Sequence, residues 1–274
     1  MVTNLSQIIL SDPSSDNIFE QLPHFVTSDP RTSRFREFGF QYNINKTFLQ
    51  KRYDSFFHGY DLQDKRVLDL GCCVGAVGAY VLSKGAKYYV GVEYSKGLSN
   101  IATINLSDSF DAERWCIKND SIENFIKNLS ENFDIVVASG IWYAMFDAIP
   151  ILLALYEKTN SIIVESMHPN LLDQYSEEIR EKFQKSDFWK QFQEKGSFIQ
   201  YKKSNDYITK TEINGSYPSI GFFKHYLNLL GFKDTNVYDL LKTELPETYF
   251  ATGRFGERFE KYKDTKEALG YVEI

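Results

Sequence analysis

Cysteine is scarce in this sequence, with three residues among 274. They are Cys72, Cys73 and Cys116, and the chain has neither a CxxC pair nor a Cys/His spacing typical of zinc ligands. Adjacent cysteines rarely bridge each other, so the pattern argues against a disulfide framework. Reduced thiols fit a cytoplasmic location, and we expect no metal site.

Long apolar runs are also missing. The longest fall far short of the roughly 18 residues of a membrane-spanning helix. The N-terminal segment MVTNLSQIILSDPSSDNIFEQLPHF lacks the basic start and long apolar core of a signal peptide. We therefore expect neither a membrane anchor nor a secretion signal.

An excess of positive charge is absent as well. The chain has 31 Lys and Arg against 37 Asp and Glu, a formal net charge of −6. This balance disfavours general nucleic-acid binding, although it leaves room for a local basic groove. Aromatic residues, by contrast, are plentiful, with 22 Phe and 18 Tyr. The surplus either lines an apolar pocket or packs within the core, and the composition does not distinguish the two.

Short apolar runs alternate with helical stretches through the middle of the chain. The expected strands are 67–70, 88–93, 114–120, 133–139 and 161–166, and the expected helices are 76–83, 96–106, 122–129 and a stretch ending near 158. Continuous apolar strands separated by helices indicate a parallel sheet covered on both faces. The sequence therefore predicts a doubly wound α/β fold.

Two segments flank or interrupt this alternation. Residues 1–60 are predicted to form a loosely ordered arm and a lead-in helix, and residues 61–274 the main domain. Within that domain, about 170–217 are expected to form an α+β insertion of amphipathic helices and a hairpin. A final helix (219–232) and two strands (233–240 and 248–255) follow. We expect the arm and the insertion to cover a pocket as a lid.

The segment VLDLGCCVGAVG, residues 67–78, has the pattern of a strand, a glycine-rich turn and a helix. Gly71 permits a tight turn, Gly75 a close approach of backbone to ligand, and Gly78 close packing of helix and strand. In a dinucleotide site a further glycine admits the pyrophosphate. Here Cys73 takes that place, which argues against NAD and is compatible with S-adenosylmethionine, a cofactor without pyrophosphate.

Acidic residues follow the next two predicted strands. Glu93 ends the second strand, where a carboxylate can accept hydrogen bonds from two ribose hydroxyls. Asp120 follows the third, beside Ser121 and Ile122, where it can meet an adenine amine. Each signal alone also fits an ordinary turn residue. The glycine-rich turn, Glu93 and Asp120 each follow one of three successive predicted strands, and together they favour a ligand that contains a nucleoside.

The segments VLDLGCCVGAVG, VGVEYS, KNDSIENF and FDIVVASGIWYAM resemble the successive motifs of the class I S-adenosylmethionine-dependent methyltransferases. The resemblance covers roughly 64–170 and resumes from PSIGFFKHYLNLLGF through TYFATGRF. It implies a Rossmann-like, mainly parallel seven-stranded sheet with a closing antiparallel strand. Cys73 departs from the family's usual glycine.

The resemblance also implies roles for particular residues. Asp69, Gly71, Cys72 and Gly75 would surround the methionine part of the cofactor, and Ser139 would lie near the sulfonium. Glu93 would hold the ribose, Tyr94 would lie against the adenine, and Asp120 and Ser121 would contact the adenine edge.

Candidates for the methyl-acceptor side are fewer. His168 follows the fifth strand and is a candidate general base, although a surface histidine before a proline is an equal alternative. Glu165 lies three residues before it, but the spacing does not favour a metal pair. Trp142, Tyr143 and Met145 either wall an acceptor pocket or pack a helix. Arg34, Arg36 and Tyr42 either reach the methionine carboxylate or form a solvated face.

We therefore expect an enzyme that transfers a methyl group from S-adenosylmethionine to an oxygen or nitrogen of a small-molecule acceptor, either a metabolite or a sugar-like compound. The NPPY signature of methyltransferases acting on planar nitrogens is absent. One alternative is an RNA or tRNA methyltransferase, for which two lysine clusters, 202–203 and 261–263, are the only indications. Another is a non-catalytic protein that binds the cofactor. The oligomeric state is left open.

Overall fold

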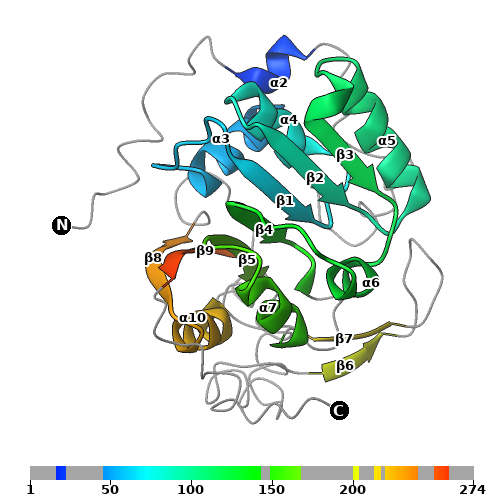
Figure 1. The fold of residues 1–274 in the computed structure, drawn as a ribbon. Helices are drawn as coiled ribbons and strands as arrows, with labels where there is room; N and C mark the ends of the chain where they lie inside the picture. The colour runs from blue at the N-terminus through cyan, green and yellow to red at the C-terminus, as the bar shows by residue number, and fades with distance from the viewer. Residues whose placement is uncertain are drawn as a thin grey trace, which may run out of the picture. The chain divides into compact units, whose positions relative to one another are not determined.

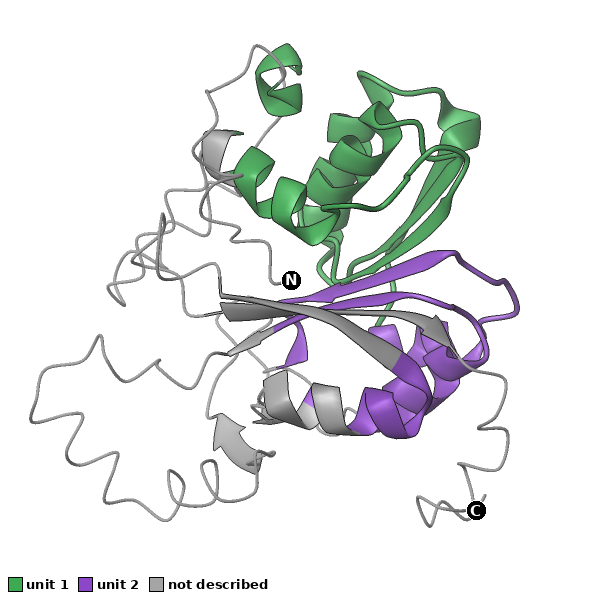
Figure 2. Cartoon of the chain, turned by 90° about the vertical axis from the view of Figure 1, so that its left-hand side faces the viewer, with its two compact units in different colours: residues 1–121, 240–248 green, residues 122–239, 249–274 purple. Residues whose placement is uncertain are grey.

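The computed structural model describes residues 17–22, 46–142, 149–167, 200–203, 213–216, 220–239 and 250–258. The chain divides into two compact units. Unit 1 comprises Met1–Ser121 with Leu240–Thr248, and unit 2 comprises Ile122–Asp239 with Tyr249–Ile274 (Figure 2).

Unit 1 is built on three parallel strands, β1 (Arg66–Leu70), β2 (Tyr88–Val92) and β3 (Trp115–Lys118). β2 lies between the other two, with Leu68 opposite Val90 and Val90 opposite Cys116. Helix α4 (Ala76–Ser83) connects β1 to β2, and α5 (Lys96–Ser107) with the short helix η2 (Ala112–Arg114) connects β2 to β3 (Figure 1). These are the βαβ connections that the sequence predicts.

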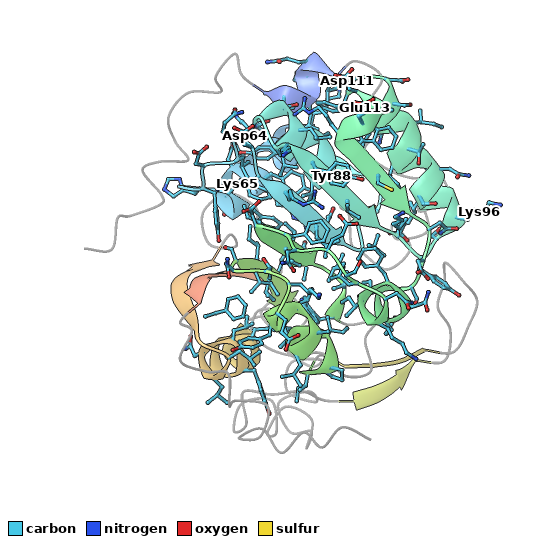
Figure 3. The ribbon with its side chains drawn as sticks, in the orientation of Figure 1. Asp64, Lys65, Tyr88, Lys96, Asp111 and Glu113 are labelled. Atoms are coloured by element: carbon cyan, nitrogen blue, oxygen red, sulfur yellow. The ribbon has the colours of Figure 1, made fainter. Side chains whose placement is uncertain are left out.

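All three strands of unit 1 therefore end at the same edge. The side chain of Lys96, at the start of α5, lies at the opposite end of the strands from Asp64 and Lys65, which precede β1 (Figure 3). The loops that follow β1, β2 and β3 accordingly gather at the Lys96 edge, where the candidate residues 69–75, 93–94 and 120–121 are found. A ligand site in a parallel sheet is expected at this carboxyl edge.

Helices α2 (Ile18–Gln21) and α3 (Lys46–Phe56) also belong to unit 1 and pack with α4. The Asn17 side chain caps α2, and Phe19 is fully buried, with its ring centroid 6.0 Å from that of Tyr53. Residues 17–22 thus form a docked helical turn, which differs from the loosely ordered arm predicted for the first part of residues 1–60. The cause is the burial of Ile18 and Phe19, which the polar composition around them conceals.

Unit 2 contains the remaining strands of the described chain. β4 (Ile135–Ser139) and β5 (Ile162–Met167) pair in parallel, β9 (Phe250–Arg258) pairs antiparallel with β5, and β8 (Phe232–Asp239) pairs antiparallel with β9. Its helices are α6 (Ile122–Lys127), α7 (Ile149–Tyr156) and α10 (Ile220–Leu229). Within the predicted insertion, β6 (Gln200–Lys203) and β7 (Ile213–Ser216) form an antiparallel pair, as the sequence predicts.

The strands form the core of each unit. Every residue of β1 and β2 after the first is buried, and so are the first four residues of β4. The predicted α/β fold with parallel strands is confirmed. Within the described part of the chain, no helix is both long enough and apolar enough to cross a membrane.

Candidate functional site

The loop that follows β1 is closed onto the end of β2. The backbone N–H groups of Gly71 and Cys72 both donate to the carbonyl oxygen of Val92, at 2.8 and 2.9 Å. The N–H of Gly75 donates to the carbonyl of Cys72 at 2.8 Å, and the Asn105 side chain of α5 donates to the carbonyl of Val74 at 2.8 Å. These hydrogen bonds give the loop a defined shape.

Cys73 adopts the backbone conformation of a glycine. Its φ is +51°, and Gly71 and Gly75 in the same loop have φ values of +77° and +80°. A side chain in this left-handed region is strained, by roughly 1–2 kcal/mol. The residue is exposed. A non-glycine residue thus adopts the left-handed backbone that the two glycines of this loop also adopt.

Gly75 is required for packing as well as for its backbone angle. A Cβ added there would lie 3.2 Å from the Cβ of Ala102 on α5. A side chain at this position would therefore push the loop away from α5. The close approach of the Gly75 backbone to a ligand stays a prediction, and the structure shows instead that this glycine permits close packing of the loop on α5.

Glu93 links the loop to the start of α5. One oxygen of its carboxylate accepts a hydrogen bond from the N–H of Cys73 at 3.0 Å, and the other accepts one from the N–H of Ser95 at 2.8 Å. Burial raises the pKa of Glu93, and the N–H groups of Ser95 and Cys73 partly oppose that rise. A half-buried carboxylate is thus held beside the loop, in the position expected for an acceptor of ribose hydroxyls.

Asn119 fixes the neighbouring backbone. Its side-chain amide donates to the carbonyls of Glu93 and Tyr94, each at 2.9 Å. The Tyr94 side chain is 62% exposed, although it is a large aromatic residue. Next to Asn119, the Asp120 carboxylate accepts the N–H of Ser121 at 2.8 Å. The structure thus brings Cys73, Glu93 and Tyr94 together with the end of β3. Asn119 was not predicted from the sequence, because its only signal is a polar residue at a strand end.

A buried polar cluster lies beneath the loop. The Tyr89 hydroxyl donates to the Asp69 carboxylate at 2.9 Å. Asp69 is 2% exposed, and its burial raises the pKa to about 7. The hydrogen bond from Tyr89 and the charge of Arg52 act in the opposite direction. Burial, followed by the charges of Asp69 and Glu93, raises the pKa of the Cys72 thiol well above its usual value, so Cys72 is a neutral thiol.

Two glycines make room for Tyr89. A Cβ on Gly78 would lie 2.5 Å from the Tyr89 ring, and a Cβ on Gly91 would lie 2.7 Å from its hydroxyl and 2.8 Å from the Cys72 sulfur. Gly78 was expected to let helix and strand approach, and Tyr89 is the side chain that fills the space. Neither Tyr89 nor Gly91 was singled out from the sequence, because nothing in the strand pattern indicates which side chain points beneath the loop.

Unit 2 contains Ser139 and Ile122. The Ser139 hydroxyl, at the end of β4, donates to the Glu165 carboxylate at 2.5 Å, and Glu165 is 2% exposed. Ile122 is a buried residue at the start of α6. Trp142 is 1% exposed, donates to the carbonyl of Ala138 and packs on Phe223 at 4.5 Å between ring centroids. The sequence left two interpretations of Trp142, a wall of an acceptor pocket or a packing residue, and these contacts support packing.

Several candidates lie outside the described residues. These are His168, Tyr143, Met145, Arg34, Arg36 and Tyr42. Among the residues that the structure describes, no group of three or more His, Cys, Asp or Glu side chains is arranged to hold a metal ion.

Three solved structures are similar to this chain over most of its length. An S-adenosylmethionine-dependent methyltransferase from Mesorhizobium loti has a TM-score of 0.51 at 15% identity, covering 72% of this chain and 93% of its own. Magnesium protoporphyrin IX methyltransferase from Synechocystis PCC 6803, with bound S-adenosylhomocysteine, has a TM-score of 0.54 at 12% identity, covering 88% and 93%. A protein from Listeria monocytogenes assigned as an S-adenosylmethionine-dependent methyltransferase has a TM-score of 0.58 at 16% identity, covering 78% and 100%.

The chain has the class I S-adenosylmethionine-dependent methyltransferase fold. At 12–16% identity the likeness concerns the fold alone. No family model matches the sequence, and no curated protein matches it either. A fold of this kind hosts many functions, so the function of this chain depends on the residues of its site.

Proposed function

We propose that the chain is an enzyme that transfers a methyl group from S-adenosylmethionine to an oxygen or nitrogen of a small-molecule acceptor. The observation that carries the proposal is the Glu93 carboxylate, which lies at the end of β2 and accepts the N–H of Cys73 across the loop. We infer that this carboxylate accepts the ribose hydroxyls of a nucleoside cofactor. We also infer that the Cys73 side chain takes the place at which a dinucleotide site has a glycine for the pyrophosphate.

The residues present fit this cofactor. Asp69, Gly71, Cys72, Cys73 and Gly75 would surround its methionine part, Glu93 would accept its ribose hydroxyls, and Tyr94 would stack on its adenine. Asp120, Ser121 and Ile122 would line the adenine edge, and Ser139 would lie near the sulfonium. The exposed ring of Tyr94 supports the adenine assignment, because an aromatic face open to solvent is available for stacking.

When bound, S-adenosylmethionine supplies a methyl group on a positively charged sulfur that leaves as a neutral thioether. The protein therefore mainly aligns the acceptor with the methyl group and removes a proton where the acceptor requires it. His168 is the proposed general base. The seven-stranded sheet with a closing antiparallel strand, which the sequence predicts, is part of the same proposal.

The small-molecule acceptor is favoured over RNA by the net charge of −6. The test is a methylation screen with labelled S-adenosylmethionine against metabolite extract, total RNA and total protein. Label in the metabolite fraction supports the proposal. Label in RNA alone would support the RNA methyltransferase, and no label in any fraction would support a non-catalytic binding protein.

The same screen tests His168 once an acceptor is known. His168→Ala should lower turnover by roughly 10²–10⁴ with cofactor affinity nearly unchanged. His58→Ala is the matched control, because His58 is an exposed residue just beyond α3. Full activity of the His168→Ala variant would show that alignment alone suffices.

A further inference from the structure

A buried carboxylate lies toward the carboxyl end of the parallel pair β4 and β5, which lie side by side in unit 2 (Figure 1). Glu165 of β5 is 2% exposed and stands opposite Ser139, the last residue of β4. The Ser139 hydroxyl donates to this carboxylate at 2.5 Å, within the range of hydrogen bonds from a hydroxyl to an ionised acceptor. A charge removed from water requires such a partner.

This hydrogen bond fixes the polarity of Ser139. A serine hydroxyl has one proton, and the proton of Ser139 points at Glu165, so toward any other group the Ser139 oxygen is an acceptor. Ser139 is half-buried whereas Glu165 is buried, so a ligand at this edge would meet the serine and not the carboxylate. The negative charge therefore acts through the serine oxygen, which it makes a stronger acceptor.

The backbone around Ser139 holds this arrangement in place. The N–H of Gly140 donates to the carbonyl of Glu165 at 3.3 Å, and the Trp142 indole donates to the carbonyl of Ala138 at 2.9 Å. Gly140 has a φ of +64°, and a Cβ there would meet no atom of the described residues within 4 Å. Parallel sheets bind ligands at the carboxyl ends of their strands. The described residues thus leave space at this end, next to Ser139.

Methyl transfer from a sulfonium moves a positive charge to the acceptor. As the bond from the acceptor atom to the methyl carbon forms, the carbon–sulfur bond breaks and its electron pair stays on sulfur. An amine nitrogen keeps its protons during this step and becomes an ammonium. A hydroxyl oxygen has a single proton, which the base must take, so its product is a neutral ether. An acceptor oxygen backed by a negative charge therefore favours the transition state of the amine, in which charge develops on a nitrogen that still has N–H groups to donate.

We propose that Ser139 accepts a hydrogen bond from the amino group of an aliphatic amine that is the methyl acceptor, and that Glu165 is the positioning residue that keeps Ser139 an acceptor. This inference rests on the proposed function and narrows its acceptor from an oxygen or nitrogen to an amine nitrogen. It agrees with the absence of the NPPY signature, which belongs to methyltransferases acting on planar nitrogens.

The first experiment tests the class of acceptor. The wild type is incubated with labelled S-adenosylmethionine and two portions of one metabolite extract. One portion is untreated, and the other is treated with sulfo-N-hydroxysuccinimide acetate, which acylates amines in water and leaves alcohols intact. The treated portion should lose most of its labelling. Equal labelling of the two portions would overturn the amine assignment and leave the proposed function standing.

The second experiment tests the pair with variants. Ser139→Ala and Glu165→Gln should each label the untreated extract about ten- to a hundred-fold more slowly, because a hydrogen bond to a charged group is removed or reversed. Their calorimetric affinity for S-adenosylmethionine should change far less. Ser139→Thr keeps the hydroxyl and should retain most of the rate. The double variant should be no slower than Ser139→Ala, since Glu165 acts through Ser139. Additive losses would contradict that dependence.

Thr159→Val is the matched control. Thr159 is 4% exposed and pairs with Phe133 at the opposite end of the same two strands. Its hydroxyl donates to the carbonyl of Ser161 at 2.9 Å, so the substitution also removes a buried hydroxyl hydrogen bond. It should lower the free energy of unfolding and leave the rate of labelling unchanged.

The failures are distinguishable. A wild type that labels no metabolite contradicts the proposed function, and the inference with it. A wild type that labels the extract while Ser139→Ala or Glu165→Gln does so equally fast overturns the role of the pair alone. An equal slowing in Thr159→Val would assign the effect to stability and also overturn the inference. Should Glu165→Gln fail to fold, the comparison of Ser139→Ala with Ser139→Thr decides.

Discussion

A single buried carboxyl dominates the electrostatics beneath the loop. Asp69 is fully enclosed, and burial raises its pKa to about 7 from an ordinary value of 3.8. Because the folded state binds the proton more tightly than the unfolded state, the neutral carboxyl favours folding at low pH. That contribution is lost as the pH rises through about 7. The protein therefore carries a buried charge above neutral pH and a neutral acid below it.

Asp69→Asn should remove this pH dependence while keeping an oxygen that can accept from Tyr89. Relative to the variant, the wild type should lose about 2–3 kcal/mol in free energy of unfolding between about pH 5 and pH 8, at 1.36 kcal/mol per pKa unit. Urea unfolding of both proteins at the two pH values measures it. Parallel changes in the two proteins would mean that Asp69 has an ordinary pKa.

Cys73 shows how far one residue can be interpreted from sequence. Its departure from glycine is visible in the printed sequence and led to the choice of cofactor. Its left-handed backbone, with φ of +51°, could not be predicted from the sequence, because a non-glycine residue rarely adopts this conformation. The hydrogen bond from its N–H to Glu93 was also unforeseen, although both residues were candidates.

At the scale of elements, the packing of β2 against the loop and α4 depends on Tyr89. The ring lies 2.5 Å from the position of a Cβ on Gly78, and its hydroxyl lies 2.7 Å from the position of a Cβ on Gly91, both too close for a side chain. Gly78→Ala and Gly91→Ala should each lower the free energy of unfolding by about 1–3 kcal/mol through overpacking.

The substitution Tyr89→Phe distinguishes the contact of the ring with position 78 from the contact of the hydroxyl with position 91. It removes the hydroxyl and leaves the ring, so it should relieve Gly91→Ala in part and Gly78→Ala not at all. Double-mutant cycles should therefore give a favourable coupling of about 1 kcal/mol for the pair 89 and 91 only. Equal couplings for the two pairs would contradict the positions assigned to the ring and the hydroxyl.

The strand and helix order was predictable from sequence because each buried strand is a short apolar run bounded by turn residues. The expected strand 88–93 and the observed β2 (Tyr88–Val92) differ by one residue. The docking of α2 was not predictable, since only two of its four residues are buried. The contributions of Tyr89 and Asn119 also escaped prediction, because each depends on which segments meet across the fold rather than on neighbours in the chain.

At the scale of the whole molecule, the fold and the site support the same account by different routes. The likeness to solved structures covers 72–88% of the chain and concerns its fold. The choice of ligand depends on a few side chains at one edge of unit 1. Glu93 and Cys73 together favour a nucleoside without a pyrophosphate, and this is the central claim.

The measurement that tests this claim most directly is calorimetric titration of the full chain with S-adenosylmethionine and, separately, with NAD. The account predicts binding of S-adenosylmethionine and none of NAD. It also predicts that Glu93→Ala weakens binding by about ten- to a hundred-fold, because two ribose hydroxyls lose a charged acceptor, and that Glu93→Gln, which keeps one oxygen, weakens it less. Binding of NAD without S-adenosylmethionine, or an unchanged affinity in Glu93→Ala, would contradict the account.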